Sequence, residues 1–263
     1  MSNNFRRIRV IPTLLLQDSG LVKTSGFRNP VYVGDPINVV RIFNEKEVDE
    51  IAILDIGAGK KGTAPQMEKI REIAAECFMP FGYGGGINSL QEIEKILRLG
   101  VEKAILNTAV FRNPSFLAEA SKEFGSSTIV VSMDVKRNLF GKPFVFVAGG
   151  KVNTGLRPAE YAKRCEDSGA GEILLTSIDQ EGKYKGYDLK LIQEVAGPAG
   201  IPVIANGGAR SVADFAEAIT EGGASAVAAG SMFVFHGKLK GVLVNFPTQD
   251  ELIKELYDAV TGR

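Results

Sequence analysis

Residues 79–110 read MPFGYGGGINSLQEIEKILRLGVEKAILNTAV, and residues 201–234 repeat their plan as IPVIANGGARSVADFAEAITEGGASAVAAGSMFV. Aligned without a gap, the two segments superpose a glycine pair at 85–86 on a glycine pair at 207–208. Each copy has the pattern of an apolar strand, a glycine turn, an amphipathic helix, a second strand and a turn of small residues. Two copies of one strand-helix-strand unit half a chain apart predict a symmetric α/β body.

The remainder of the chain continues this alternation. Apolar runs of strand length occur at 9–16, 50–56, 81–83, 103–107, 128–134, 172–177, 202–205 and 225–229. Helical patterns occur at 36–44, 65–76, 89–99, 114–124, 158–168, 189–196, 211–221 and 249–260. Buried strands that alternate with helices indicate a parallel sheet, and eight such units predict a closed (β/α)8 barrel with duplicated half-barrels. An open doubly wound sheet is the alternative, but no GxGxxG sequence follows the first strand.

Length and composition narrow the functional classes. A chain of 263 residues fits one (β/α)8 domain, since such barrels commonly run to ~250 residues, and residues 140–147 add a predicted β-ribbon after the fifth strand. Basic and acidic residues number 31 each, so no general field would attract nucleic acid or anionic lipid. No apolar run approaches ~18 residues, and we therefore expect a cytoplasmic protein without a membrane segment. A single histidine and two separated cysteines predict neither a metal site nor a bound cofactor.

Polar residues that follow the barrel strands are the first site candidates, because the loops after the strands' carboxyl ends form the active face of such a barrel. These candidates are Gln17, Asp18, Lys23, Asp55, Asn107, Thr108, Asp134, Thr176, Asp179, Glu181, Asn206, Gly230 and Ser231. Asp134 ends the run TIVVSMD, which predicts a carboxylate in the barrel mouth; the alternative is a cap or an ion pair. Asp55 and Asp179 are either catalytic or loop carboxylates that bond backbone NH groups. Lys23, in a predicted polar loop, either binds phosphate or is solvated.

The duplicated glycine turns are candidate phosphate sites. Gly85 and Gly86 precede one helix, and Gly207 and Gly208 precede another, so that free backbone NH groups meet a helix N-terminus. Glycine also serves any tight turn or close packing, and one such turn alone would indicate little. Two of them on opposite sides of a barrel mouth suit a ligand that carries a phosphate at each end, together with the polar turns at 107–108 and 230–231.

Charged residues also mark the beginnings of four predicted strands, where the opposite opening of the barrel lies. They are Arg9, Glu50, Lys103 and Glu172. Their alternating signs predict either a ring that closes the barrel axis or an ordinary solvated rim.

These motifs together resemble one family. The order IPxLLLxD, VKT, GDP, LDI, YGGGI, NTAV, DVKR, GAGEILLTSIDxxG, IANGGA and AAGSMFVFHGK resembles HisF, the cyclase subunit of imidazole glycerol phosphate synthase, over most of the chain. The resemblance implies a substrate with two phosphates held across the mouth, with Gly182 among the phosphate-binding residues. It also implies a HisH-like glutaminase docked on the opposite face, whose ammonia passes along the barrel axis through a gate at the four charged positions.

One position departs from the family's pattern. The resemblance implies two aspartates as general acid and base, one on the first strand and one at Asp134. The first-strand position falls on Leu15, within IPTLLLQDSG, where histidine-pathway members read IPCLDVKDG. Leucine cannot carry a proton, so one of the two proton carriers is missing. The family's acidic residue at the sixth strand is also altered, to Glu181, a change that keeps the charge.

The LLL variant is similar to HisF paralogues of the WbuZ type, which accompany surface-polysaccharide genes. That resemblance implies that the barrel and a HisH-like glutaminase supply ammonia to a third, amidotransferase-like protein, which converts an N-acetyl sugar to an acetamidino sugar. Two alternatives remain: a histidine-pathway cyclase, and a silent scaffold that activates the glutaminase. An isomerase on the same half-barrel plan is disfavoured, since it needs no ammonia gate and relies on a first-strand aspartate.

Overall fold

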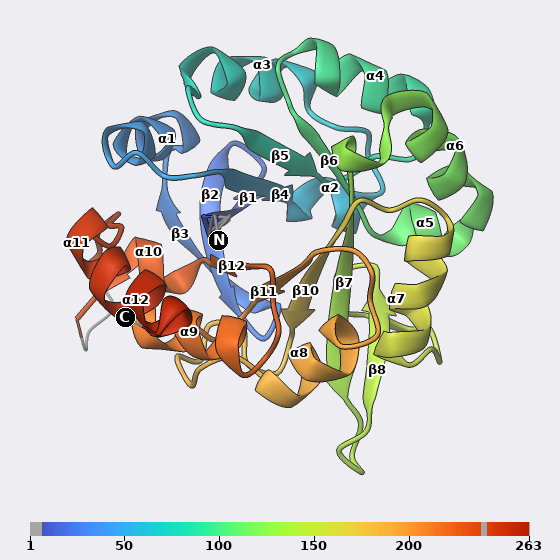
Figure 1. Ribbon diagram of the computed structural model, residues 1–263. Helices are drawn as coiled ribbons and strands as arrows, with labels where there is room; N and C mark the ends of the chain where they lie inside the picture. Colours follow the sequence, from blue (N-terminus) through green and yellow to red (C-terminus); the bar gives the residue numbers. More distant parts are fainter. Residues whose placement is uncertain (1–6, 238–240, 263) are drawn as a thin grey trace, which may run out of the picture.

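Eight parallel strands close into a barrel in the computed structural model, which describes residues 7–237 and 241–262 (Figure 1). In barrel order the strands are β1 (Val10–Gln17), β4 (Ile51–Asp55), β5 (Phe81–Gly84), β6 (Lys103–Leu106), β7 (Ile129–Arg137), β10 (Glu172–Ser177), β11 (Val203–Asn206) and β12 (Ala226–Ala229). β12 pairs with β1 through Val10 and Val227, which closes the sheet. The predicted (β/α)8 barrel is therefore confirmed.

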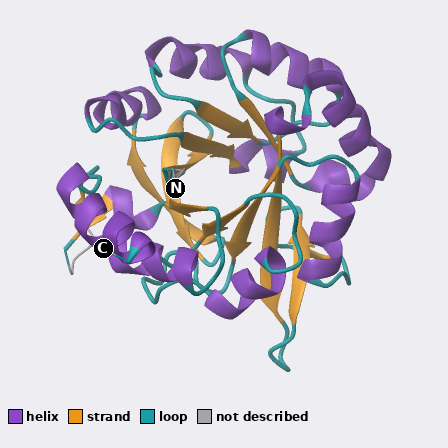
Figure 2. Cartoon of the chain, viewed as in Figure 1, coloured by secondary structure: helices purple, strands orange, loops and turns teal. Residues whose placement is uncertain are grey.

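Helices form a ring around this sheet, as Figure 2 shows. The major ones are α1 (Pro36–Glu45), α3 (Met67–Glu76), α4 (Leu90–Arg98), α6 (Pro114–Phe124), α7 (Pro158–Asp167), α8 (Leu189–Ala196) and α9 (Val212–Thr220). The last predicted helix is observed as α11 (Gln249–Leu252), the π-helical turn η2 (Ile253–Tyr257) and α12 (Asp258–Thr261). The sequence patterns missed α2 (Ile56–Lys61), α5 (Thr108–Arg112), α10 (Ser231–Val234) and the 3₁₀ turn η1 (Ser126–Thr128), because none is long enough to show a helical period.

Two antiparallel hairpins extend the barrel at corresponding places in its halves. β2 (Gly20–Ser25) folds back on β1 and pairs with β3 (Arg28–Gly34). β8 (Pro143–Val147) folds back on β7 and pairs with β9 (Val152–Asn153), which confirms the predicted ribbon after the fifth strand. A further short pair, β13 (Phe235–His236) and β14 (Gly241–Val242), follows α10; Lys238, in the last family motif, lies outside the described residues.

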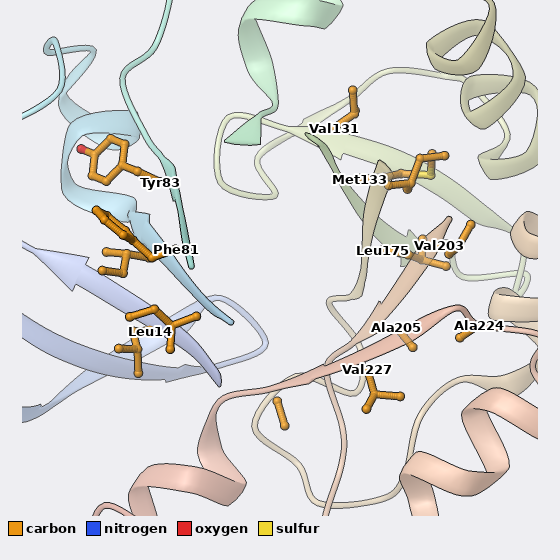
Figure 3. Packing of buried hydrophobic residues seen from close by; sticks show 14 of the residues in the cluster. Leu14, Phe81, Tyr83, Val131, Met133, Leu175, Val203, Ala205, Ala224 and Val227 are labelled. Atoms are coloured by element: carbon orange, nitrogen blue, oxygen red, sulfur yellow. The ribbon is translucent and has the colours of Figure 1, made fainter. Parts of the chain in front are cut away.

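Two apolar layers hold the barrel together. The larger lies between strands and helices and includes Leu14, Val131, Met133 and Leu175 (Figure 3). The smaller lies inside the barrel and consists of Ile11, Ala52, Ile105, Val130, Leu174, Ile204, Ala226 and Ala228. Because side chains alternate between the two faces of a strand, residues two positions further on project above this inner layer. The charged residues at the strand beginnings lie below it.

Candidate functional site

A cavity of about 640 Å³ opens at the carboxyl ends of the barrel strands. Its lining includes most of the predicted site residues: Leu15, Lys23, Asp55, Gly85, Gly86, Asn107, Thr108, Asp134, Thr176, Glu181, Gly182, Asn206, Gly207, Gly208, Gly230 and Ser231. Residues from both halves of the barrel thus meet in one space, as expected for a parallel barrel whose loops share one face. Of the predicted site residues in these loops, Gln17, Asp18 and Asp179 are absent from the lining.

Asp134 is a buried carboxylate of the cavity, as are Asp55 and Glu181. It lies on β7 with only 8% of its surface exposed, and Asn107 Nδ2 donates to its Oδ2 over 3.1 Å. Burial raises the pKa of the Asp134 carboxyl to about 7, although its hydrogen bonds to Asn107 and Ser132 act to lower that pKa. A carboxyl group with a pKa near neutrality can either accept or donate a proton, which suits general acid–base chemistry.

Leu15 occupies the corresponding place on β1 and also lines the cavity. It pairs with Leu54 of β4 and with Val22 of β2. Asp134, by contrast, pairs with Thr176 of β10. The wall formed by β1 and β4 is therefore apolar at the level where the wall formed by β7 and β10 carries a carboxylate and a hydroxyl.

Lys23 is in a strand and buried, which corrects the predicted polar loop. It lies on β2 with 5% of its surface exposed, and its Nζ is 3.4 Å from Glu181 Oε1. Thr24 Oγ1 donates to the other Glu181 oxygen over 3.2 Å. Burial lowers the pKa of the Lys23 ammonium below its ordinary value, while Glu181 acts to raise it. The prediction was wrong because residues 18–34 show no apolar run, whereas the hairpin is fixed by pairing with β1.

The carboxylates of Asp55 and Asp179 bond backbone NH groups. Asp55 caps α2, since its Oδ1 accepts from Ala58 N over 2.9 Å, and Gln66 Nε2 donates to its Oδ2 over 2.8 Å. Asp179 Oδ2 accepts from Arg137 N over 2.8 Å. This geometry matches the structural alternative for both residues. Asp55 nevertheless lines the cavity.

The glycine turns have a steric explanation. A Cβ atom on Gly85 would lie 2.4 Å from the Asp55 carbonyl oxygen, and one on Gly208 would lie 2.2 Å from the Gly186 carbonyl oxygen. Both glycines have positive φ angles, 126° and 117°, which side chains disfavour. Close packing against the preceding loop therefore requires glycine in both halves. Phosphate binding by these turns stays a prediction, supported by their position in the cavity wall.

Hydroxyl and amide groups form a polar layer just above the apolar interior. Asn107 Nδ2 donates to the Ser132 carbonyl oxygen over 2.9 Å, and Asn206 Nδ2 donates to Thr176 Oγ1 over 3.0 Å. Thr13 also lines the cavity, and its buried Oγ1 has no hydrogen-bond partner among the described residues. Sequence reasoning missed Thr13 because it stands in an apolar run, but its place two residues before Leu15 puts it on the same strand face.

At the opposite end of the barrel, the four charged residues form a closed ring. Arg9 donates to Glu50 and to Glu172, in each case over 2.6 Å. Lys103 Nζ lies 3.0 Å from Glu50 Oε2 and 2.9 Å from Glu172 Oε2. Each carboxylate is thus shared by both cations, so these side chains form the ring and not the solvated rim that was the alternative. The ring closes the barrel axis below the apolar layer.

Comparison with known proteins identifies the family of this barrel. The model of the histidine biosynthesis protein family matches residues 9–240. The chain belongs to this family. It is 49% identical over 246 residues to the Pseudomonas aeruginosa protein named "Putative imidazole glycerol phosphate synthase subunit hisF2", covering 94% of this chain and 98% of that protein.

Other relatives carry similar names. The chain is 45% identical over 251 residues to a Vibrio vulnificus protein named "Putative imidazole glycerol phosphate synthase subunit hisF3", covering 95% of this chain and 96% of that protein. It is 39% identical over 228 residues to the imidazole glycerol phosphate synthase subunit HisF of Alkaliphilus metalliredigens, covering 87% and 90%. The resemblance to HisF deduced from the motifs is thereby confirmed. In the described part of the chain, no helix is both long and apolar enough to span a bilayer.

Proposed function

We propose that the chain is the ammonia-using subunit of a glutamine amidotransferase complex. A HisH-like glutaminase docks on the face that bears the charged ring and releases ammonia into the barrel. The ammonia reaches the cavity and is used for acetamidino-sugar synthesis in surface polysaccharide formation, with a third, amidotransferase-like protein completing the transfer. The cavity binds a phosphorylated or sugar ligand through the glycine turns and Lys23. Neither nucleic acid nor membrane takes part.

The layers along the barrel axis support an ammonia route. Arg9, Glu50, Lys103 and Glu172 act as the gate, and rearrangement of their ion pairs opens the axis. Above them lies the apolar layer around Ile11, which disfavours an ammonium ion far more than neutral ammonia because burial of an unpaired charge is costly. The polar cavity follows directly above that layer.

Leu15 is the residue that favours ammonia supply over cyclisation. A cyclase that needs carboxylates on both sides of its substrate would meet Asp134 on one wall and a leucine side chain on the other. Lys23 and Glu181, which are paired with each other, and Asp55, which caps α2, contribute further charges to the cavity lining. The proposal therefore assigns the barrel to ammonia supply and ligand binding, and the full amidation to the third protein.

The test compares the wild type with Leu15→Asp. The purified protein receives an ammonium salt and the ribulosyl-formimino-carboxamide ribonucleotide used by histidine-pathway cyclases, and the formation of imidazole glycerol phosphate is measured. We expect the wild type to be slower than the variant by at least about a hundredfold, since one positioned proton carrier contributes 10²- to 10⁴-fold. Equal rates would show that Leu15 does not limit cyclisation.

The second candidate is a histidine-pathway cyclase. It would be favoured if the wild type and Leu15→Asp formed imidazole glycerol phosphate at equal and rapid rates. Asp134 supports this candidate, since burial raises its carboxyl pKa to about 7 beside the cavity. The names of the relatives support it as well.

A scaffold that only activates the glutaminase is the third candidate. Asp134→Asn separates it from the cyclase, because the substitution keeps the size of the side chain and removes its proton exchange. Unchanged yield of the ammonia-dependent product, with the glutaminase still bound, would support the scaffold.

A further inference from the structure

The two hairpins of the barrel meet beside the cavity mouth. Phe27, in the turn between β2 and β3, lines the cavity, as do Gly149 and Lys151, in the turn between β8 and β9. A methyl group on Gly150 would lie 3.1 Å from the Phe27 ring, so the two turns are in contact distance. The two turns thus touch each other beside the cavity mouth, where they form part of the rim of the barrel's open face.

Exposed apolar side chains concentrate on this face. The segments that follow the carboxyl ends of β1, β7 and β12 carry Val31, Tyr32, Leu139, Phe140, Val152, Val242 and Leu243. Leu139 is fully exposed and Phe140 is 87% exposed, both at the tip of the β7–β8 hairpin, which Figure 1 shows projecting beyond the ring of helices. Elsewhere in the described chain, the large apolar side chains with high exposure are Phe78 and Ile253. The adjacent pair Leu139 and Phe140 is the most exposed apolar group of this face and favours an interaction surface.

The same face is basic, although the chain as a whole has no net charge. Exposed basic side chains in the described segments that follow barrel strands include Arg28, Lys142, Lys151, Lys183 and Lys185. Exposed acidic side chains in those segments are Asp18 and Asp35. Asp35 caps α1, where its carboxylate accepts from Ile37 N and Asn38 N. The rim therefore presents positive charge around exposed aromatic and aliphatic groups.

We infer that this open-face rim docks a partner protein through an acidic surface of that partner. Opposite charge guides the approach of the two proteins, while Tyr32, Phe140 and Arg28 are residue types that commonly anchor protein interfaces. A protein fits better than a membrane, because the apolar groups are divided between hairpins on two sides of a cavity mouth and form no amphipathic helix. The rim also differs from the ring face, where the glutaminase is proposed to bind.

The identity of the partner rests on the proposed function. If ammonia reaches the cavity, an open mouth would release it to water as ammonium before use. A protein seated on the rim would cover the mouth and receive the ammonia directly. The partner is accordingly the enzyme that consumes the ammonia, recognised by its acidic docking surface.

Site-specific photo-crosslinking is the experiment that would identify this partner. A benzoylphenylalanine replaces Phe140 in the full-length chain expressed in its own cells, and a second chain carries it at Phe78, between α3 and β5 on the opposite side. We expect one protein, identified by mass spectrometry, to be linked from position 140 and not from position 78. Equal linking from both positions, or none from position 140, would overturn the inference.

Charge reversal then tests the contact with the purified partner. Lys142→Glu with Lys185→Glu should weaken binding by about tenfold or more, as should raising the salt concentration from low to physiological and above. Lys46→Glu with Lys122→Glu changes the net charge equally away from the rim and should leave binding within twofold. Unchanged binding by the Lys142→Glu, Lys185→Glu variant would overturn the inference.

Two further outcomes separate the explanations. The first is that the chain sediments with vesicles of phosphatidylcholine and phosphatidylglycerol, that Leu139→Ser with Phe140→Ser abolishes this binding, and that no protein is crosslinked. This outcome would show that the rim binds a membrane instead of a protein. A salt-sensitive complex that forms normally but receives no ammonia from a glutamine-fed assembly would keep the docking surface and remove the proposed ammonia route.

Discussion

The two halves of the barrel share one plan and differ in one wall. Each half begins with a long strand followed by an antiparallel hairpin, β1 with β2 and β7 with β8, and each has a glycine turn that packs on the preceding loop. At the cavity, however, the first half presents Leu15 beside Leu54, whereas the second presents Asp134 beside Thr176. Backbone packing thus keeps the duplicated frame, while the side chains that project from it have diverged.

A carboxylate on both walls of the cavity should have the largest effect on the rate of cyclisation. In a Leu15→Asp background, adding Asp134→Asn should lower ammonium-dependent cyclisation by about a thousandfold, because each wall then contributes a proton carrier that the other cannot replace. Leu15→Asn is the matched control, since asparagine has the size of aspartate without its acid–base chemistry. If the double variant kept the rate of Leu15→Asp, the two positions would not act as a pair.

Asp134, which has no counterpart at Leu15, should also make the stability of the fold depend on pH. Because the pKa of Asp134 is about 7 in the folded chain and lower when unfolded, the folded state holds this proton more tightly between about pH 4 and pH 7. Its contribution to the free energy of unfolding is therefore present at low pH and is lost as the pH rises through 7, on the order of 4 kcal/mol in total. Urea unfolding of wild type and Asp134→Asn across this range measures the difference. Parallel pH profiles would contradict the expectation.

The Lys23–Glu181 pair joins the halves, since Lys23 lies on β2 and Glu181 follows β10. Lys23→Met should destabilise the fold by about 3 kcal/mol, because Glu181 is left as an unpaired buried charge. Replacing both residues with apolar ones should cost less than the sum of the single changes. Arg71→Met, which breaks an exposed pair with Glu68, is the control and should change the unfolding free energy by less than about 1 kcal/mol. Additive costs would show that the pair does not couple the halves.

The smallest expected difference concerns the helix caps after the two glycine turns. Glu92 accepts from Ser89 N over 3.1 Å and from Asn88 N over 2.7 Å at a partly exposed site, while the buried Asp214 accepts from Ser211 N over 3.1 Å and from Arg210 N over 2.8 Å. Glu92→Ala should cost about 1 kcal/mol and Asp214→Ala about 2 kcal/mol, since burial raises the cost of unsatisfied NH groups. Thermal unfolding checks the order, and a reversed order would refute it.

Local patterns predicted most of the fold and part of the site. The apolar runs predicted every barrel strand to within a few residues, because burial on both faces leaves a direct trace in the sequence. The hairpin around Lys23 left no such trace, since its pairing partner β1 lies earlier in the chain and stabilises a polar segment. Asp134 was predicted to reach the mouth from its place at a strand's end. The bond from Arg137 N to Asp179 depends on two separate loops and could not be read locally.

The sequence by itself determined the barrel and its duplicated halves. Those features follow from periodicity and residue type, which are properties of the chain alone. Only the tertiary structure decided that Arg9 and Lys103 share both glutamates, that Lys23 is buried against Glu181, and that the two hairpins meet at the mouth. Each of these depends on the closure of the sheet, which brings together residues far apart in sequence and removes the water that would otherwise separate their charges.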